Sequence, residues 1–199
     1  MLAIIGGSGL TTLANLSVSR KVVATTAWGD PSSPITIGEI AGKSVMFLAR
    51  HGPGHTIPPH KINYRANIFA LKGAGATQIV AVAAVGGIGA ECLPGTLVVP
   101  DQIVDYTSGR AHTYFDGHDK HVVHIDFTWP YSSTLRDRLI AAAGAAGVNV
   151  VARGVYGATN GPRLETAGEI LRMERDGCTL VGMTGMPEAA LAREQDLAY

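Results

Sequence analysis

The stretch around which the chain is organised is residues 48–67, LARHGPGHTIPPHKINYRAN. It continues an apolar run, Val45 to Ala49, that has the length and composition of a buried strand. Two glycines and three prolines then exclude regular structure from Gly52 to Pro59, and a helical pattern follows at once. The sequence therefore predicts a strand, a stiff loop and a helix in succession, with Arg50 and His51 at the carboxyl end of the strand.

The position of Arg50 and His51 suggests a binding site, because small ligands bind at the carboxyl ends of strands in open α/β sheets. A guanidinium there suits a phosphate or a carboxylate, since its planar fork donates two parallel hydrogen bonds. An arginine at a strand end can equally form a surface ion pair, so the pattern alone leaves both interpretations open. His51, His55 and His60 also raise the question of zinc. However, Gly-Pro-Gly prevents helical presentation of the first two, and no cysteine or carboxylate lies nearby, so we predict no metal site.

Bulk properties restrict the class of protein. A chain of 199 residues is suited to one α/β domain with a substantial core. Lys+Arg and Asp+Glu both number 16, and this balance argues against a nucleic-acid or membrane partner. Cys92 and Cys178 are too few and too far apart for a disulfide framework, and neither a signal peptide nor a membrane-spanning stretch is recognisable. We therefore predict a cytoplasmic protein that acts on small molecules.

Two further apolar runs end in glycines, at residues 6–9 and 86–89. Glycine lets the backbone turn sharply and present its N–H groups to an anion, and Ser8 adds a hydroxyl. The dinucleotide-binding fingerprint fails in both runs, because Thr12 and Cys92 occupy the place of its third glycine. A nucleotide-binding dehydrogenase is therefore a weaker alternative.

The remaining sequence predicts one domain, residues 1–199, with a twisted mixed central β-sheet flanked by helices. Residues 78–85 are the most uniformly apolar segment and are predicted to form a single buried strand. Residues 108–126 form a long polar excursion of the kind that is often functional or interfacial. Thr166 and Glu169 have capping-box spacing, and Pro187 suits the first turn of a helix. Residues 197–199 resemble the start of another strand, so we expect a final strand and helix beyond the sequence.

Six motifs, taken together and in this order, are specific to one family. They are Gly6-Gly7-Ser8-Gly9-Leu10, Ala49-Arg50-His51-Gly52, Asn63-Tyr64-Arg65-Ala66-Asn67, Asp105-Tyr106-Thr107, Gly161-Pro162-Arg163 and Gly182-Met183-Thr184-Gly185-Met186-Pro187-Glu188. Over nearly the whole chain they resemble the purine nucleoside phosphorylases of the methylthioadenosine phosphorylase type. The forms of residues 84–88, 105–110 and 183–189 look most like the bacterial S-methyl-5′-thioinosine phosphorylase branch.

The resemblance implies phosphorolysis, in which inorganic phosphate attacks the anomeric carbon of a purine nucleoside through an oxocarbenium-like transition state. For this branch the products are hypoxanthine and 5-methylthioribose 1-phosphate. Cleavage of S-methyl-5′-thioadenosine, a general 6-oxopurine nucleoside phosphorylase and a non-catalytic nucleoside-binding module are the alternatives. The resemblance also implies a homotrimer and no metal or organic cofactor, since phosphate is a co-substrate.

Site residues follow by matching positions to the family. The positions that match phosphate-binding residues are Ser8, Arg50, His51, Ala83, Ala84 and Thr184. Arg50 and His51 would also be catalytic, and Arg50 is expected to bind phosphate through two parallel hydrogen bonds. Ala83 departs from the family, which often has a threonine there, and so offers only its backbone.

Other matching positions concern the nucleoside. Met183 matches a ribose contact, and His124 matches a histidine that a neighbouring subunit contributes to the pocket of the 5′-substituent, with His55 nearby. Leu164 and Glu165 match positions linked to substrate specificity, although an aromatic residue often stands at the place of Leu164. The residue that recognises N7 and the 6-substituent of the base would follow Tyr199.

Overall fold

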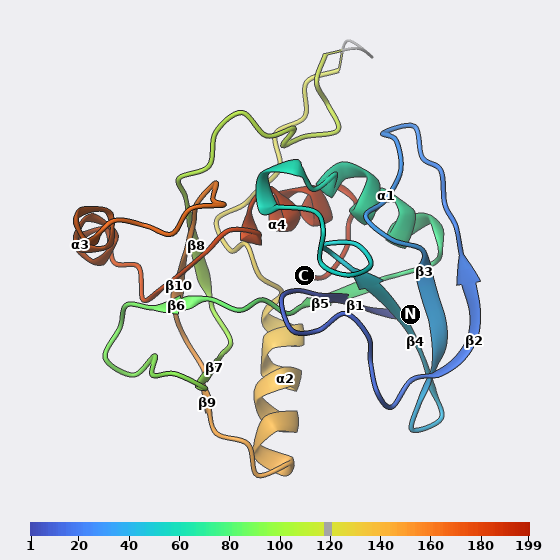
Figure 1. The fold of residues 1–199 in the computed structure, drawn as a ribbon, viewed down its shortest axis with the longest axis horizontal. Coiled ribbons are helices and arrows are strands. Elements are labelled where there is room, and N and C mark those ends of the chain that lie inside the picture. The colour runs from blue at the N-terminus through green and yellow to red at the C-terminus, as the bar shows by residue number, and fades with distance from the viewer. Residues whose placement is uncertain (118–120) are drawn as a thin grey trace.

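The computed structural model describes residues 1–117 and 121–199 and has an α/β architecture. One sheet contains β1 (Leu2–Gly6), β2 (Ser17–Val22), β3 (Ile35–Ile40), β4 (Lys43–Ala49) and β5 (Gln78–Ala81), in the order β2-β3-β4-β1-β5. In this sheet β1 runs parallel to β4 and β5, whereas β3 is antiparallel to its two neighbours. The predicted mixed sheet and the α/β class are thus confirmed (Figure 1).

The strands are not gathered into a single sheet, because a second sheet lies beside the first (Figure 1). It contains β6 (Gly86–Gly87), β8 (Gln102–Asp105), β10 (Val155–Ala158) and β11 (Leu180–Gly182), in the order β6-β11-β10-β8. A separate parallel pair is formed by β7 (Leu97–Val98) and β9 (Val150–Val151). Residues 78–85 were expected as one strand, but only residues 78–81 form one, β5; residues 82–85 are not in a strand and lead to β6 in the second sheet.

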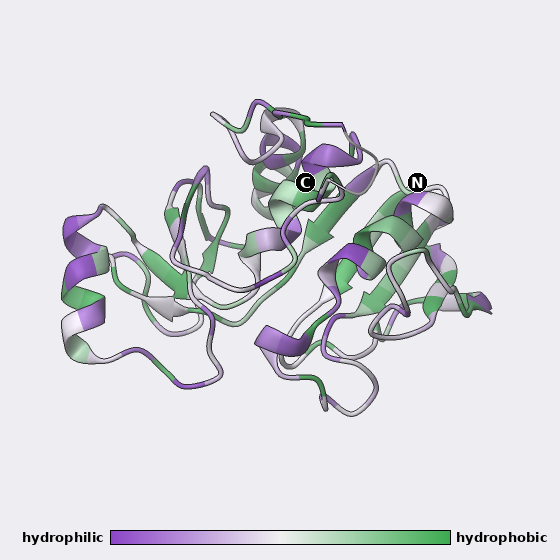
Figure 2. Cartoon of the chain, turned by 90° about the horizontal axis from the view of Figure 1, so that it is seen from above, coloured by the Kyte–Doolittle hydropathy of each residue, from purple (hydrophilic) through white to green (hydrophobic). Residues whose placement is uncertain are grey.

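The helices are α1 (Tyr64–Gly73), α2 (Ser133–Ala145), α3 (Ala167–Arg175) and α4 (Gly185–Glu194), together with the 3₁₀ turn η1 (Pro59–Lys61). Helices α1 and α4 pack against each other and share the main core with the first sheet (Figure 1). Ile5, Met46, Leu71 and Leu191 are fully buried there. Figure 2 shows this interior as hydrophobic strands beneath helices whose outer residues are more polar. Burial of these apolar side chains supplies the main driving force for folding.

The helix starts that the sequence predicted for α3 and α4 are present in the structure. Thr166 and Glu169 form a complete capping box at the start of α3. Met186 is not helical, so the regular part of α4 begins at Pro187, whose missing N–H is harmless in a first turn. Residues 108–117 and 121–126 contain no helix or strand, as expected of the excursion, and the rest of it lies outside the described residues. Among the described residues, none of the helices is both long and apolar enough to cross a membrane.

Candidate active site

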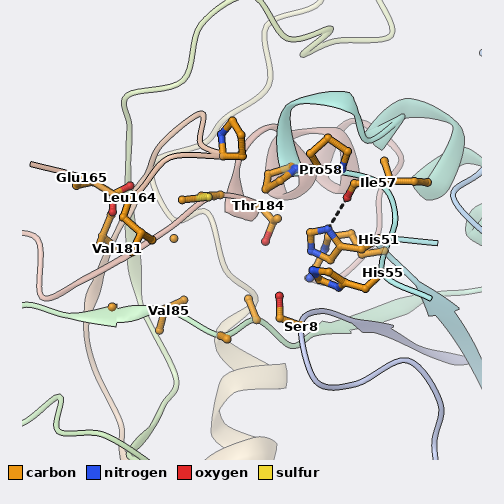
Figure 3. A pocket seen from close by; sticks show the side chains of 18 of the residues that line it. Ser8, His51, His55, Ile57, Pro58, Val85, Leu164, Glu165, Val181 and Thr184 are labelled. Atoms are coloured by element: carbon orange, nitrogen blue, oxygen red, sulfur yellow. Dashed lines mark hydrogen bonds between the residues drawn. The ribbon is translucent and has the colours of Figure 1, made fainter. Parts of the chain in front are cut away.

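A cavity of about 830 Å³ lies between the two sheets, at the carboxyl ends of β1, β4, β5 and β11. We call it the active-site cavity (Figure 3). The residues that line it are Ser8, Arg50, His51, His55, Thr56, Ile57, Pro58, Pro59, Ala83, Ala84, Val85, Gly86, Pro162, Leu164, Glu165, Val181, Gly182, Met183 and Thr184. All the predicted site residues except His124 are therefore brought together.

The parallel pairing of β1 with β4 and β5 places their ends at one level. Gly6 is paired with Ala49, and the Arg50 N–H donates to the Gly6 carbonyl at 2.9 Å. Gly7 then passes so close to its neighbours that an added Cβ would lie 2.5 Å from the Val82 carbonyl and 2.8 Å from Arg50 Nη1. A glycine is required at this point because three strand ends converge on it.

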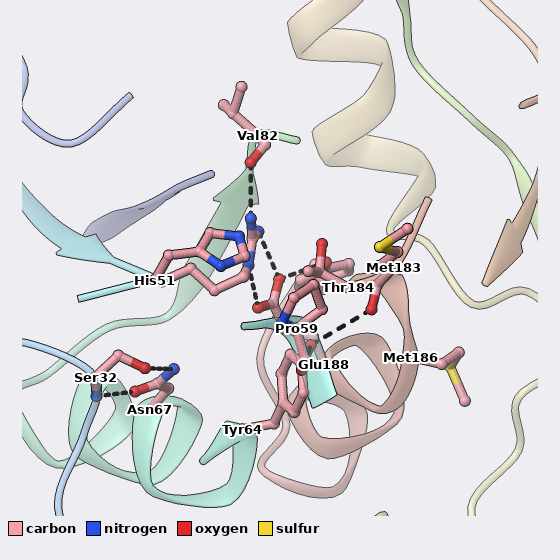
Figure 4. Close-up of polar contacts among 12 residues, drawn as sticks. Ser32, His51, Pro59, Tyr64, Asn67, Val82, Met183, Thr184, Met186 and Glu188 are labelled. Atoms are coloured by element: carbon pink, nitrogen blue, oxygen red, sulfur yellow. Dashed lines mark hydrogen bonds and ion pairs between the residues drawn. The ribbon is translucent and has the colours of Figure 1, made fainter. Parts of the chain in front are cut away.

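Arg50 is buried and paired with a carboxylate that sequence reasoning missed. Its Nε donates to Glu188 Oε2 at 2.7 Å, Nη2 donates to Oε1 at 2.9 Å, and Nη1 donates to the Val82 carbonyl at 2.9 Å (Figure 4). The two side chains are 1% and 0% exposed. Burial alone would lower the pKa of Arg50, but the Glu188 carboxylate outweighs it and raises that pKa, so Arg50 stays a cation.

This pairing changes the expected role of Arg50. A guanidinium has five N–H donors, and three of those of Arg50 have partners within the protein. One N–H on Nη1 and one on Nη2 are left for a ligand, while the Nε edge of the fork belongs to Glu188. In the sequence Glu188 stands out only as the last residue of the motif of residues 182–188, and nothing there indicates that it pairs with Arg50.

His51 is held in one tautomer. Its Nδ1 lies 2.8 Å from the Ile57 carbonyl, which can only accept, so Nδ1 carries the hydrogen (Figure 3). Burial lowers the pKa of His51 and outweighs the hydrogen bond to the Ile57 carbonyl, which raises it; the electrostatic effects of His55 and Arg50 also lower this pKa. His51 is therefore neutral at pH 7, and its Nε2 is a hydrogen-bond acceptor rather than a donor. The rings of His51 and His55 lie 4.3 Å apart between centroids.

The opposite side of the cavity is formed by segments that follow β10 and β11. Met183 and Thr184 follow β11 directly, and the Thr184 N–H donates to the Tyr156 hydroxyl at 3.3 Å. Glu165 accepts a hydrogen bond from the Thr159 hydroxyl at 2.6 Å, a partner that the sequence did not suggest. Leu164 is 80% exposed at the cavity's edge, which leaves room for a substrate beside it.

His124 is exposed and does not line the cavity of its own chain. The sequence-based expectation assigns it to the site of a neighbouring subunit, so its role stays a prediction. Among residues 1–117 and 121–199, no group of three or more His, Cys, Asp or Glu side chains is arranged to hold a metal ion.

Comparisons with known proteins agree with this geometry. Probable S-methyl-5′-thioinosine phosphorylases from Pseudomonas syringae pv. tomato and Xanthomonas campestris pv. campestris are 58% and 55% identical to this chain. The alignments cover 99% and 100% of the chain and 80% and 79% of those proteins. A 6-oxopurine nucleoside phosphorylase from Pyrococcus furiosus is 46% identical, over 100% of the chain and 76% of its own length.

A solved structure of methylthioadenosine phosphorylase from Schistosoma mansoni in complex with adenine superimposes with a TM-score of 0.96. It is 35% identical and matches 100% of this chain and 78% of its own. The family model described as the phosphorylase superfamily matches residues 1–199. These matches confirm the resemblance inferred from the motifs and overturn the dehydrogenase alternative. The converging strand ends and the full-length matches together establish that the chain belongs to the phosphorylase superfamily.

Proposed function

We propose that this protein cleaves S-methyl-5′-thioinosine with inorganic phosphate, giving hypoxanthine and 5-methylthioribose 1-phosphate. The observation that carries the proposal is that a single cavity gathers all six expected phosphate-binding residues on the same rim as Met183, Leu164 and Glu165. Relatives that are 58% and 55% identical bear the corresponding name. The cavity volume also falls within the usual range of small-molecule sites.

The geometry supports a specific way of holding the nucleophile. Phosphate receives the two remaining N–H groups of Arg50 and hydroxyl or backbone donors from Ser8, Ala84 and Thr184. Hydrogen phosphate still carries one hydroxyl, and the Nε2 acceptor of neutral His51 is suited to receive its hydrogen. Fixing the phosphate beneath the sugar converts a bimolecular attack into an effectively unimolecular one, which supplies much of the acceleration.

The charge of this subsite also fits the reaction. Because Glu188 neutralises Arg50 and His51 is neutral, the buried groups around the phosphate add up to little net charge. Phosphate is thus positioned by hydrogen bonds without being trapped by an excess of positive charge. Its own negative charge then stabilises the developing oxocarbenium ion. No metal or organic cofactor has a part in this proposal.

A second candidate is a 6-oxopurine nucleoside phosphorylase of broader specificity. It is favoured by the 46% identity to the enzyme from Pyrococcus furiosus. Cleavage of S-methyl-5′-thioadenosine is supported by the structural likeness to the Schistosoma mansoni enzyme. The three substrates differ in the 5′-group or the 6-substituent, so a direct comparison of kcat/KM distinguishes them.

We also propose a homotrimer located in the cytoplasm. A shared site would explain why His124 lies outside the cavity of its own chain, and Val122 and Trp129, 81% and 66% exposed, offer apolar surface near it for a subunit contact. Light scattering tests the assembly. A fully active monomer would contradict a site shared between subunits.

The function is tested by incubating the protein with phosphate and S-methyl-5′-thioinosine and following hypoxanthine release by chromatography. S-methyl-5′-thioadenosine and inosine serve as competing substrates, and omission of phosphate is the control. We expect phosphate-dependent cleavage with the highest kcat/KM for S-methyl-5′-thioinosine. Nucleoside binding without cleavage would favour a binding module, and phosphate-independent cleavage would refute phosphorolysis.

A further inference from the structure

The excursion that begins at residue 108 contains Arg110, which binds two of the segments that form the active-site cavity directly and reaches a third through Tyr64. These segments are the loop of residues 51–59, the β10 loop of residues 159–165 and the β11 loop of residues 183–186. Arg110 itself does not line the cavity. We propose that Arg110 is a positioning residue that holds these three segments in the arrangement that binds the nucleoside. Its kinetic test rests on the function proposed above.

The guanidinium joins the β10 loop to the β11 loop through backbone carbonyls. Nη2 donates to the carbonyls of Thr159 and Asn160 at 3.2 and 3.0 Å. Nη1 donates to the carbonyls of Met183 and Met186 at 2.8 and 2.5 Å. The four N–H groups on the two Nη atoms therefore meet four carbonyls, two from each loop. A lysine could not reproduce this pattern, because its ammonium is a compact point charge with three donors.

The third segment is reached through Tyr64, the first residue of α1. Arg110 lies over the Tyr64 ring, 5.3 Å from its centroid, and Nη1 is 3.3 Å from the tyrosine hydroxyl. That hydroxyl donates to the carbonyl of Pro59, a cavity residue, at 2.9 Å. Figure 4 shows Tyr64 pointing towards both Pro59 and Met183. Arg110 and Tyr64 thus couple the loop after β4, in the first sheet, to the loops of the second sheet.

The position of these contacts explains why they matter for the nucleoside. The Met183 carbonyl accepts a hydrogen bond from Arg110, and the N–H of the same peptide unit, that of Thr184, donates to the Tyr156 hydroxyl. The peptide between them is therefore fixed in orientation, and with it the side chains of Met183 and Thr184 in the cavity. Backbone carbonyls bound by a charged donor are held more strongly than by neutral donors. Loss of the guanidinium would release both loops at once.

Arg136, in α2, provides a matched control away from the active-site cavity. Arg136 is also partly buried and also binds backbone carbonyls, donating to Pro100 and Ala152 at 2.8 and 2.6 Å. None of these residues lines the active-site cavity. Replacing Arg136 therefore removes the same kind of interaction without touching the cavity.

The experiment compares Arg110→Met, Arg110→Lys and Arg136→Met with the wild-type protein in three measurements. These are the Tm, the kinetics with S-methyl-5′-thioinosine at saturating phosphate, and amide hydrogen exchange in residues 57–62, 159–161 and 183–186. We expect Arg110→Met to lower kcat/KM for the nucleoside by about tenfold or more, mainly through KM, and to accelerate exchange in the three segments. Arg136→Met should lower the Tm but leave kcat/KM within about twofold of wild type and exchange in these segments unchanged.

Wild-type KM and exchange in Arg110→Met, or equal kinetic losses in the two methionine variants, would overturn the proposal. If Arg110→Met does not fold, Arg110→Lys decides by the same criteria, because it keeps the charge and part of the hydrogen bonding. If the wild-type protein cleaves no purine nucleoside, the proposed function fails. Hydrogen exchange then still decides whether Arg110 holds the three segments.

Discussion

Removing the Glu188 carboxylate while Arg50 stays in place is expected to destabilise the protein strongly. The two side chains are 0% and 1% exposed, so water does not screen the cation that would be left behind. Glu188→Ala deletes both hydrogen bonds to Arg50 and the one that the Tyr199 hydroxyl donates at 2.9 Å. Breaking one side of such a buried pair typically costs about 3–5 kcal/mol, chiefly because an unpaired charge stays buried.

The assay is urea denaturation at neutral pH, with and without phosphate. Because inorganic phosphate would be the nearest available anion for Arg50, its addition should stabilise Glu188→Ala more than it stabilises the wild-type protein. Arg153→Met is the control, since that arginine is 86% exposed in its ion pair with Asp101 and such pairs contribute about 0–1 kcal/mol.

A double variant provides the sharper test. Replacing both members, as in Arg50→Met with Glu188→Leu, leaves no unpaired charge, so its stability should return towards that of the wild type although activity is lost. A loss below about 1 kcal/mol in Glu188→Ala, or a double variant no more stable than the single one, would refute the reasoning.

Three further predictions concern the site. Gly161→Ala should raise the nucleoside KM, because φ is +59° at this position and an added Cβ would clash with Met183 Sδ. Steady-state kinetics at saturating phosphate measures this KM. Thr159→Val should raise the nucleoside KM by about tenfold with little change in the phosphate KM, because Glu165 loses its 2.6 Å hydrogen bond. The two KM values are measured by separate titrations of nucleoside and phosphate, and equal changes in both would contradict this prediction. Burial lowers the pKa of His51 below 6.5, so the unfolded state takes up its proton first and folding stability falls as the pH drops below 6.5. His51→Gln should flatten that part of the stability–pH curve in denaturation experiments, and an unchanged slope would contradict the shift.

Features that depend on neighbours along the chain could be predicted from the amino-acid sequence. The apolar run before Arg50 became the buried end of β4, and the proline-rich loop and α1 followed in the predicted order. Thr166 and Glu169 capped α3 as their spacing required. Such signals are local, because a buried strand or a helix cap is determined by side chains a few residues apart. The order of the motifs was also sufficient to identify the family.

Features that depend on contacts between distant residues were decided only by tertiary structure. Glu188 is 138 residues from Arg50 in the sequence, and no periodicity indicates that these two side chains share one pair of hydrogen bonds. The same is true of Arg110, whose acceptors lie up to 76 residues away. The end of β5 at Ala81, where the chain leaves the first sheet before it joins the second at Gly86, likewise depends on which strands pair, and an apolar run satisfies a longer or a shorter strand equally well. Residue types thus specify which groups can bind an anion, whereas chain packing decides how many of their hydrogen-bond donors are still available to it.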